Sequence, residues 1–224
     1  MKGRCTFCQH TFSKGGMSRH LDTCKQRPAD SPPARQGTRR SDRRFHLLVG
    51  TPRGSTYWLH LEASSRATVE DLDALLRDTW LECCGHLSEL RLGERRFIDT
   101  RGGYIDYGDE PMTIALGRLL SPGQTLQYQY DFGSTTELAI KVVSERPGVG
   151  SEPIEILARN DPPDFKCVTC EKPATMLCSQ CWWSDDAWFC DDCAAKHACG
   201  EEMLLPIVNS PRVGVCGYTG TPGW

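Results

Sequence analysis

The chain of 224 residues is long enough for one to three small domains, and its formal net charge of -3 excludes a strongly basic nucleic-acid binder or a highly acidic tail. No apolar run approaches the ~18 residues of a membrane span, and the N-terminus lacks the apolar core of a signal peptide. We therefore expect a cytoplasmic protein that makes no membrane contact. The thirteen cysteines gather at both ends with only Cys83 and Cys84 between them, which indicates metal modules around a metal-free core.

Residues 1–26 carry a pattern of metal ligands in two close pairs. Two residues separate Cys5 from Cys8, and three separate His20 from Cys24, so a helix would turn the second pair toward one ion. The spacing resembles that of C2H2 zinc fingers in their CCHC variant. A segment this short cannot bury enough surface to fold alone, so zinc binding is expected to supply its folding free energy.

The purpose of this finger has two interpretations. If the resemblance extends to DNA reading, the base-contacting positions fall near Ser13, Gly16 and Arg19. Only Arg19 suits base contact, and one finger covers only ~3 bp. Protein contact or purely structural use is the alternative that we favour.

Residues 27–44 are rich in Pro, Ser, Gly and Arg and almost free of apolar side chains, so we expect a flexible linker. It is either a solvated tether or a basic arm that contacts nucleic-acid phosphates in a salt-sensitive manner. The basic residues from the last metal ligand of the finger to the end of the linker are Lys25, Arg27, Arg35, Arg39, Arg40, Arg43 and Arg44.

Residues 45–160 have the pattern of a packed α+β domain. A helix is predicted from Thr68, which can cap it, through about Cys84, because the apolar residues recur at three- and four-residue steps. A short helix or turn is predicted at 114–120. The order of elements predicts a β-grasp-like sheet packed on one main helix. Alternating apolar residues predict strands at 45–49, 57–61, 87–92, 95–98, 124–132, 137–144 and 155–158.

Two segments of this domain, Thr79–Leu87 and Leu126–Ser134, look like the signatures of the plasmid pRiA4b ORF-3-like family. The segments Leu205–Arg212 and Gly214–Tyr218 resemble a tail found in its zinc-bearing members. The resemblance implies the fold and a link to plasmid or mobile-element biology, because some members are labelled as passengers or resolvase-type proteins of insertion elements. Ser134 stands where the family pattern has an acidic residue.

The central domain has no recognisable spacing of an acid–base pair or a nucleophile. We therefore predict no catalytic and no cofactor-binding residue, and lean against an enzyme. Cys83 and Cys84 are adjacent at the predicted end of the helix, where one is expected to pack inward as a buried thiol.

Residues 161–224 contain a second pattern of metal ligands. Three Cys-x2-Cys pairs and a His-x-Cys supply eight soft ligands within 33 residues, enough for two closed zinc sites. The alternative, a disulfide framework, requires an oxidising compartment. Closed sites leave no coordination position for a substrate, so we expect these zinc ions to be structural. With the site of the finger included, we expect about three zinc ions per chain. The eight residues are Cys167, Cys170, Cys178, Cys181, Cys190, Cys193, His197 and Cys199.

This spacing resembles that of the cross-braced MYND and B-box families. Their interleaved order implies that the first and third cysteine pairs share one ion and that the second pair shares the other with His197 and Cys199; sequential pairing stays open. Cys216 is a rival to Cys199 as the eighth ligand, because His197-x-Cys199 is tighter than the usual spacing. Of the adjacent Trp182 and Trp183, one is expected to be an exposed anchor for a partner.

Three hypotheses of function follow. The favoured one is a non-enzymatic zinc-binding interaction or adaptor protein with a protein partner, linked to plasmid or mobile-element biology. The second is a DNA-binding protein that uses the finger and the arginine-rich linker. The third, a nucleic-acid-processing enzyme of resolvase type, depends only on the family label.

Overall fold

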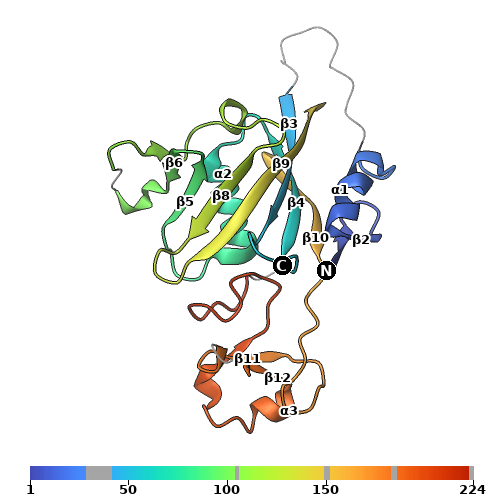
Figure 1. The fold of residues 1–224 in the computed structure, drawn as a ribbon, viewed down its shortest axis with the longest axis vertical. Coiled ribbons are helices and arrows are strands. Elements are labelled where there is room, and N and C mark those ends of the chain that lie inside the picture. Colours follow the sequence, from blue (N-terminus) through green and yellow to red (C-terminus); the bar gives the residue numbers. More distant parts are fainter. Residues whose placement is uncertain (29–41, 104–105, 149–151, 183–185, 222–224) are drawn as a thin grey trace. The chain divides into compact units, whose positions relative to one another are not determined.

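The computed structural model describes residues 1–28, 42–103, 106–148, 152–182 and 186–221. The chain forms two compact units (Figure 1). Unit 1 comprises Met1–Leu76 and Leu87–Asp161, and unit 2 comprises Arg77–His86 and Pro162–Trp224. The class is α+β, with a ten-stranded mixed sheet in unit 1, a three-stranded sheet in unit 2 and few helices.

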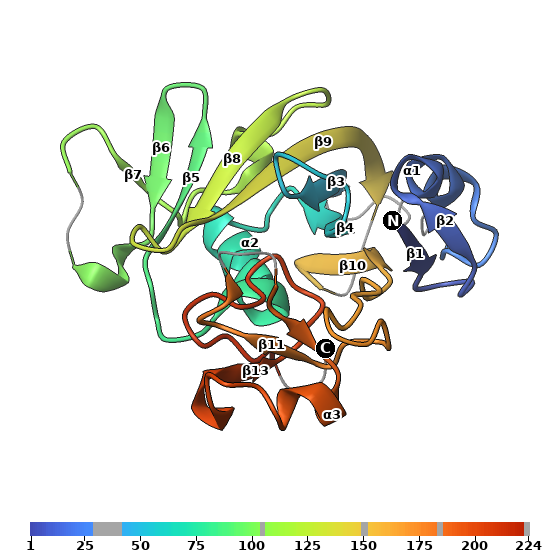
Figure 2. The same cartoon turned by 60° about the horizontal axis from the view of Figure 1, so that its bottom comes forward.

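The sheet of unit 1 has the strand order β2-β1-β10-β4-β3-β9-β8-β5-β6-β7, which can be followed from one edge to the other in Figure 2. Neighbouring strands are antiparallel except β6 and β7. Alternating burial along β8 and β9 shows why these segments form strands, since every second side chain enters the core. The strands are β1 Lys2–Cys5, β2 Thr11–Ser13, β3 Asp42–Gly50, β4 Trp58–Ser64, β5 Ser88–Leu92, β6 Arg95–Ile98, β7 Glu110–Pro111, β8 Thr125–Tyr130, β9 Thr136–Gly148 and β10 Ile154–Asn160.

The main helix of unit 1 is α2, Val69–Leu76. Thr68 caps it as predicted: its hydroxyl accepts from the Asp71 amide at 3.1 Å, and the Asp71 carboxylate accepts from the Thr68 amide at 2.7 Å. The helix is shorter than predicted, because the chain widens into the π-turn η1, Arg77–Leu81, and does not continue to Cys84. Short 3-10 turns follow at Thr100–Gly102 (η2) and Leu116–Arg118 (η3), the second inside the predicted 114–120 segment.

Arg43 and Arg44 do not belong to a linker. Both lie in β3, which pairs with β9 from Asp42 opposite Gly148 onward, so the sheet begins before the predicted first strand. Arg44 is almost fully buried, with its guanidinium 3.3 Å from the carboxylate of Glu155. Residues 29–41, which make up most of the predicted linker, lie outside the described residues.

A buried charge network crosses the sheet at Glu62, whose side chain is only 7% exposed. Its carboxylate contacts Arg27 at 2.5 Å, Arg146 at 2.8 Å and Arg44 at 3.7 Å. A buried carboxylate needs such partners, because an unpaired charge in the interior is strongly destabilising. Arg27, predicted as part of the basic linker, is therefore engaged within unit 1.

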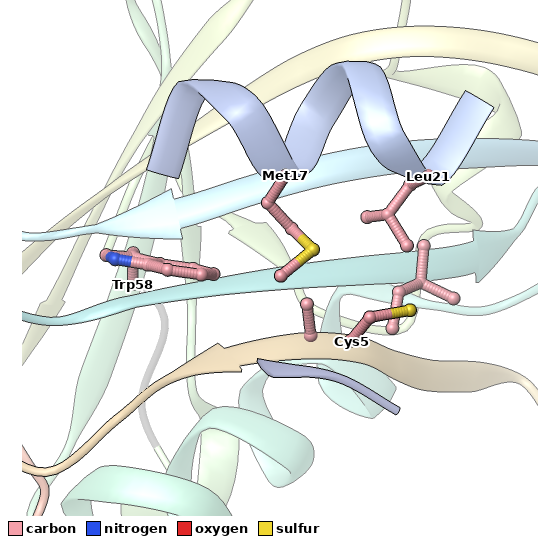
Figure 3. Packing of buried hydrophobic residues seen from close by; sticks show 6 residues of the cluster. Cys5, Met17, Leu21 and Trp58 are labelled. Carbon is pink, nitrogen blue, oxygen red and sulfur yellow. The ribbon is translucent and has the colours of Figure 1, made fainter. Parts of the chain in front are cut away.

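The N-terminal finger is part of the ten-stranded sheet. Its hairpin strand β1 pairs with β10, with Gly3 opposite Asn160 and Cys5 opposite Ala158. Its helix α1, Lys14–Thr23, buries one face, and Figure 3 shows Met17 and Leu21 pointing from α1 toward Trp58 and Cys5. The other buried members of this cluster are Leu157 and Ala158 of β10.

Unit 2 is a small fold with three short strands in the order β12-β11-β13. They are β11 Met176–Cys178, β12 Trp188–Phe189 and β13 Leu204–Pro206, accompanied by the helix α3 Asp191–Ala194 and the 3-10 turn η5 Glu201–Met203. Its main buried cluster is largely made of cysteines, which indicates that apolar packing alone does not hold it. Among the residues described here, no helix is long and apolar enough to cross a membrane.

Candidate metal centres

Every cysteine of the chain lies in one of four tetrads. The thirteen cysteines combine with His20, His86 and His197 into four groups of four, and within each group the ligand atoms all lie within 4.8 Å of one another. Each tetrad could hold a metal ion, and thiolate with imidazole is a donor set that zinc prefers. We call them the N-terminal tetrad (Cys5, Cys8, His20, Cys24), the Cys167 tetrad (Cys167, Cys170, Cys190, Cys193), the Cys178 tetrad (Cys178, Cys181, His197, Cys199) and the fourth tetrad (Cys83, Cys84, His86, Cys216).

The distances between ligand atoms fit a shared tetrahedral ion. With Zn–S of ~2.3 Å and Zn–N of ~2.0 Å, a regular tetrahedron has S···S edges of ~3.8 Å and S···N edges of ~3.5 Å. The sulfurs of Cys181 and Cys199 are 3.7 Å apart, Cys181 Sγ is 3.4 Å from His197 Nε2, and the sulfurs of Cys170 and Cys190 are 3.6 Å apart. A disulfide would need ~2.05 Å, and the cysteines are free.

The N-terminal tetrad is built as its spacing predicts, from a hairpin and a helix. Cys5 ends β1 and Cys8 lies in the following turn, which is closed by a hydrogen bond from the Gln9 amide to the Cys5 carbonyl at 3.0 Å. His20 lies on α1, and its Nε2 is 3.2 Å from Cys8 Sγ. Cys24 is the C-terminal cap of that helix. The two pairs therefore meet from opposite sides.

Local contacts prepare these groups for metal binding. The ring of Phe12 stacks on His20 with 4.1 Å between centroids, which fixes the imidazole plane. Burial, with a smaller contribution from His10, lowers the pKa of His20, so the neutral ring that a metal requires is favoured. Burial alone would raise the pKa of Cys24, but hydrogen bonds from backbone amides lower it overall and favour the thiolate.

The two tetrads of the C-terminal module follow the interleaved order. Cys167 and Cys170 meet Cys190 and Cys193, while the second cysteine pair meets His197 and Cys199. The sequential order is not observed in the structure. Cys199, rather than Cys216, completes the second of these groups. The ligand pairs of the two groups alternate along the chain. Each metal ion would therefore join two segments that have a ligand pair of the other ion between them.

Backbone amides aim at the sulfur of Cys167 in the first turn of this module. Burial would raise the pKa of that thiol, but hydrogen bonds from the backbone at Cys190, Thr169 and Cys170 lower it to about 6. The turn itself closes through the Glu171 amide, which donates to the Cys167 carbonyl at 2.9 Å, with Glu171 in the left-handed region at φ 61°. Such amide donors stabilise thiolate charge and are what a metal knuckle requires.

Aromatic side chains pack against one another and against a ligand ring in this module. Phe165 stacks on Trp188 with 3.7 Å between centroids, and Trp182 meets Trp188 edge-on at 5.4 Å. Phe189 lies 4.3 Å from the His197 ring. Trp183, predicted with Trp182 as a candidate anchor, lies outside the described residues.

The fourth tetrad was not predicted from the sequence. Cys84 Sγ lies 2.9 Å from His86 Nε2 and 3.6 Å from both Cys83 Sγ and Cys216 Sγ, and His86 Nε2 lies 3.4 Å from Cys216 Sγ. The expectation of an inward, buried thiol at this pair is therefore wrong, because Cys84 is exposed and Cys83 only half-buried. Hydrogen bonding among the neighbouring thiols, first with Cys83, raises the pKa of Cys84 to about 12.

The buried histidines of the sheet are not part of a tetrad. His46 Nε2 and His60 Nδ1 are 2.8 Å apart, and His60 Nε2 is 3.3 Å from the carbonyl oxygen of Lys14. Burial lowers the pKa of His46 to about 4 and that of His60 to about 3. The pair is therefore neutral at physiological pH and serves as a hydrogen-bonded core element.

Comparisons with known proteins give no family. No protein-family model matches the chain, and no curated protein matches it. Among solved structures, a similar one is the crystal structure of a protein of unknown function, MM3350 from Methanosarcina mazei Go1. It matches with a TM-score of 0.45 and 14% identity over 53% of this chain and 69% of that chain. This distant likeness carries no functional argument.

Proposed function

We propose that this protein is a non-enzymatic zinc-binding interaction or adaptor protein. The observation that carries the proposal is that all thirteen cysteines belong to complete tetrads. A zinc ion with four protein ligands has no open position for water or substrate, so it stabilises a fold and does not catalyse. The metal would hold two small, cysteine-rich regions in shape for a protein partner.

Contacts of the basic residues support a protein partner over DNA. The hydroxyl of Ser13, a candidate base-contacting group, accepts from the Gly16 amide and caps α1. Arg27 pairs with Glu62, and Arg43 lies 3.3 Å from the carboxylate of Glu145. Cations that are already paired release fewer counterions on meeting phosphate and contribute less to nucleic-acid affinity.

The DNA-binding alternative is supported by two exposed cations of the finger, Arg19 and Lys25. It should be tested on the full chain, because removal of residues 1–44 would also remove β1 and uncover Trp58. Duplex-DNA affinity is measured over a salt series for the wild type and for the double variant Arg19→Ala, Lys25→Ala. The adaptor proposal expects identical, weak curves; a steep salt slope that the double variant flattens would favour DNA binding.

The finer identity of the central domain belongs to the same proposal. We take its β-grasp-like arrangement from the order of its elements, and its pRiA4b ORF-3-like character from the resemblances of Thr79–Leu87 and Leu126–Ser134. A link to plasmid or mobile-element biology follows from that resemblance. The order of one main helix followed by antiparallel hairpins is consistent with it.

Substitution with cobalt tests whether the metal sites are closed. Co²⁺ takes the same tetrahedral sites as zinc, and its visible spectrum responds to any added ligand. We expect the spectrum of the cobalt-loaded full chain to remain unchanged on titration with azide or thiocyanate, because each ion already has four protein ligands. A saturable spectral change would identify an open coordination position, and would argue for a catalytic metal and against the proposal.

A further inference from the structure

We propose that the fourth tetrad is a structural zinc site that fastens the C-terminal tail to the segment Arg77–His86. The inference rests on the proposed function, in which the tetrads take zinc, and adds a site whose ligands no sequence motif joins. Cys84 and Cys216 are 132 positions apart, yet their sulfurs lie 3.6 Å from each other. That separation and the 3.4 Å from His86 Nε2 to Cys216 Sγ match the edges of a zinc tetrahedron.

The backbone around the ligands is shaped to bring them together. Cys216 has φ 51°, in the left-handed region that a residue with a side chain rarely adopts. The neighbouring Gly217 at φ 65° and Gly85 at φ 77° allow the two turns that carry the ligands. A cysteine held in this strained conformation is expected where the surroundings gain from its position, as they do when its thiolate completes a metal site.

A buried arginine gives a second, independent indication. Arg212 is fully buried, and its Nη2 donates to Cys83 Sγ at 3.4 Å. A neutral thiol is only a weak acceptor, whereas a metal-bound thiolate carries charge that a guanidinium can balance. Three thiolates, one imidazole and Zn²⁺ leave the site with one net negative charge. Arg212 is placed to offset that charge.

The tail is seated next to the site by contacts that need no metal. The hydroxyl of Ser210 donates to the carbonyl of Trp80 at 2.6 Å and accepts from the Arg212 amide at 2.8 Å. Tyr218, two residues after Cys216, is buried. These contacts hold both ligand-bearing segments in register, so the ligands are preorganised and a zinc ion completes the connection.

The fourth site differs from the other three in access. Cys84 and Cys216 are both exposed, whereas each of the other tetrads contains at least one buried cysteine. An exposed site exchanges its ion more readily, since chelators and solvent reach the metal–sulfur bonds. We therefore expect the fourth zinc to be the first that the protein loses.

The test combines zinc content with cysteine alkylation on the full chain. The zinc-loaded wild type is expected to contain four zinc ions, and N-ethylmaleimide is expected to leave Cys84 and Cys216 unmodified despite their exposure. The variant His86→Ala should contain three zinc ions and become alkylated at Cys84 and Cys216. The exposed Cys170 of the Cys167 tetrad is the matched control and should stay protected in both proteins.

Each other outcome overturns the inference. Three zinc ions in the wild type, with Cys84 and Cys216 alkylated at once and Cys170 protected, would show that the fourth tetrad holds no metal. A disulfide between Cys83 and Cys84 in freshly purified protein would do the same. Failure of the proposed function would be seen in a different measurement. It would appear as the binding of an added ligand to cobalt at any of the sites, whatever the number of zinc ions per chain.

Discussion

Replacement of Leu21 by alanine tests whether the N-terminal finger and the sheet form one cooperative structure. Leu21 is only 1% exposed and packs with Met17, Trp58 and Leu157, so it belongs to a core that the finger shares with β4 and β10. If the finger were an independent module on a flexible linker, the substitution would destabilise only the finger. A shared core predicts that the sheet is destabilised as well.

The size of the effect follows from burial. Removing a fully buried leucine side chain costs about 2–5 kcal/mol, through lost transfer free energy and the cavity that remains. For a unit of about 150 residues, each kcal/mol lowers the midpoint of thermal unfolding by about 2–4 °C. We therefore expect Leu21→Ala to lower the melting temperature of unit 1 by roughly 5–15 °C.

The assay is hydrogen exchange of the peptides that contain β4 and β10, together with thermal unfolding in excess zinc. Both strands should exchange faster in Leu21→Ala, and the exposed Arg19→Ala on the same helix serves as the control. If the variant loses protection only within residues 1–26 while β4, β10 and the melting temperature stay as in the wild type, the shared core does not exist and the reasoning fails.

Two further predictions concern buried charge. The folded pKa values of His46 and His60 lie below the unfolded value of ~6.5. The neutral pair therefore contributes its full share of the free energy of unfolding above that pH, and this contribution is lost as the pH falls toward about 4. In urea unfolding, the free energy should depend less steeply on pH in His46→Gln than in the wild type, whereas the exposed control His10→Gln, with the same metal sites, should keep the wild-type dependence. Glu62→Gln should destabilise the protein by about 3–5 kcal/mol because it leaves buried arginines without their carboxylate. The control Glu137→Gln, at an exposed position, should change the free energy of unfolding by under about 1 kcal/mol. An equal effect of the two substitutions would show that the charge network at Glu62 does not stabilise the fold.

The strands were predictable because their signal is local. Alternation of apolar residues and nearby turn residues located most paired segments of the central sheet to within a few residues. The short strand β7 was not predicted, and β9 runs on to Gly148. That extension depends on its partner β3, which begins at Asp42 in a stretch that reads as polar linker. Arg44 is buried there because Glu62 and Glu155 neutralise it, and composition alone does not reveal such partners.

The metal ligands also divide into those that the local sequence reveals and those that only the fold brings together. Cys-x2-Cys pairs are recognisable because one turn can present both sulfurs to one ion. Cys83 and Cys84 lack that spacing, and their fourth partner Cys216 is brought to them only by the fold. The available signal was arithmetic: Cys83, Cys84 and Cys216 were left over after three sites, and His86 lies two residues further along.

The pairing of β1 with β10 has a consequence for protein quality. Without the finger, β10 would be the edge of the sheet and would present unpaired amides and carbonyls to other chains. Gly3 makes the cover close-fitting, since any side chain there would strike the Arg159 carbonyl and the Trp58 ring. In a cell short of zinc the finger would not fold, and β10 would become an exposed edge strand. The first consequence would be aggregation through β10.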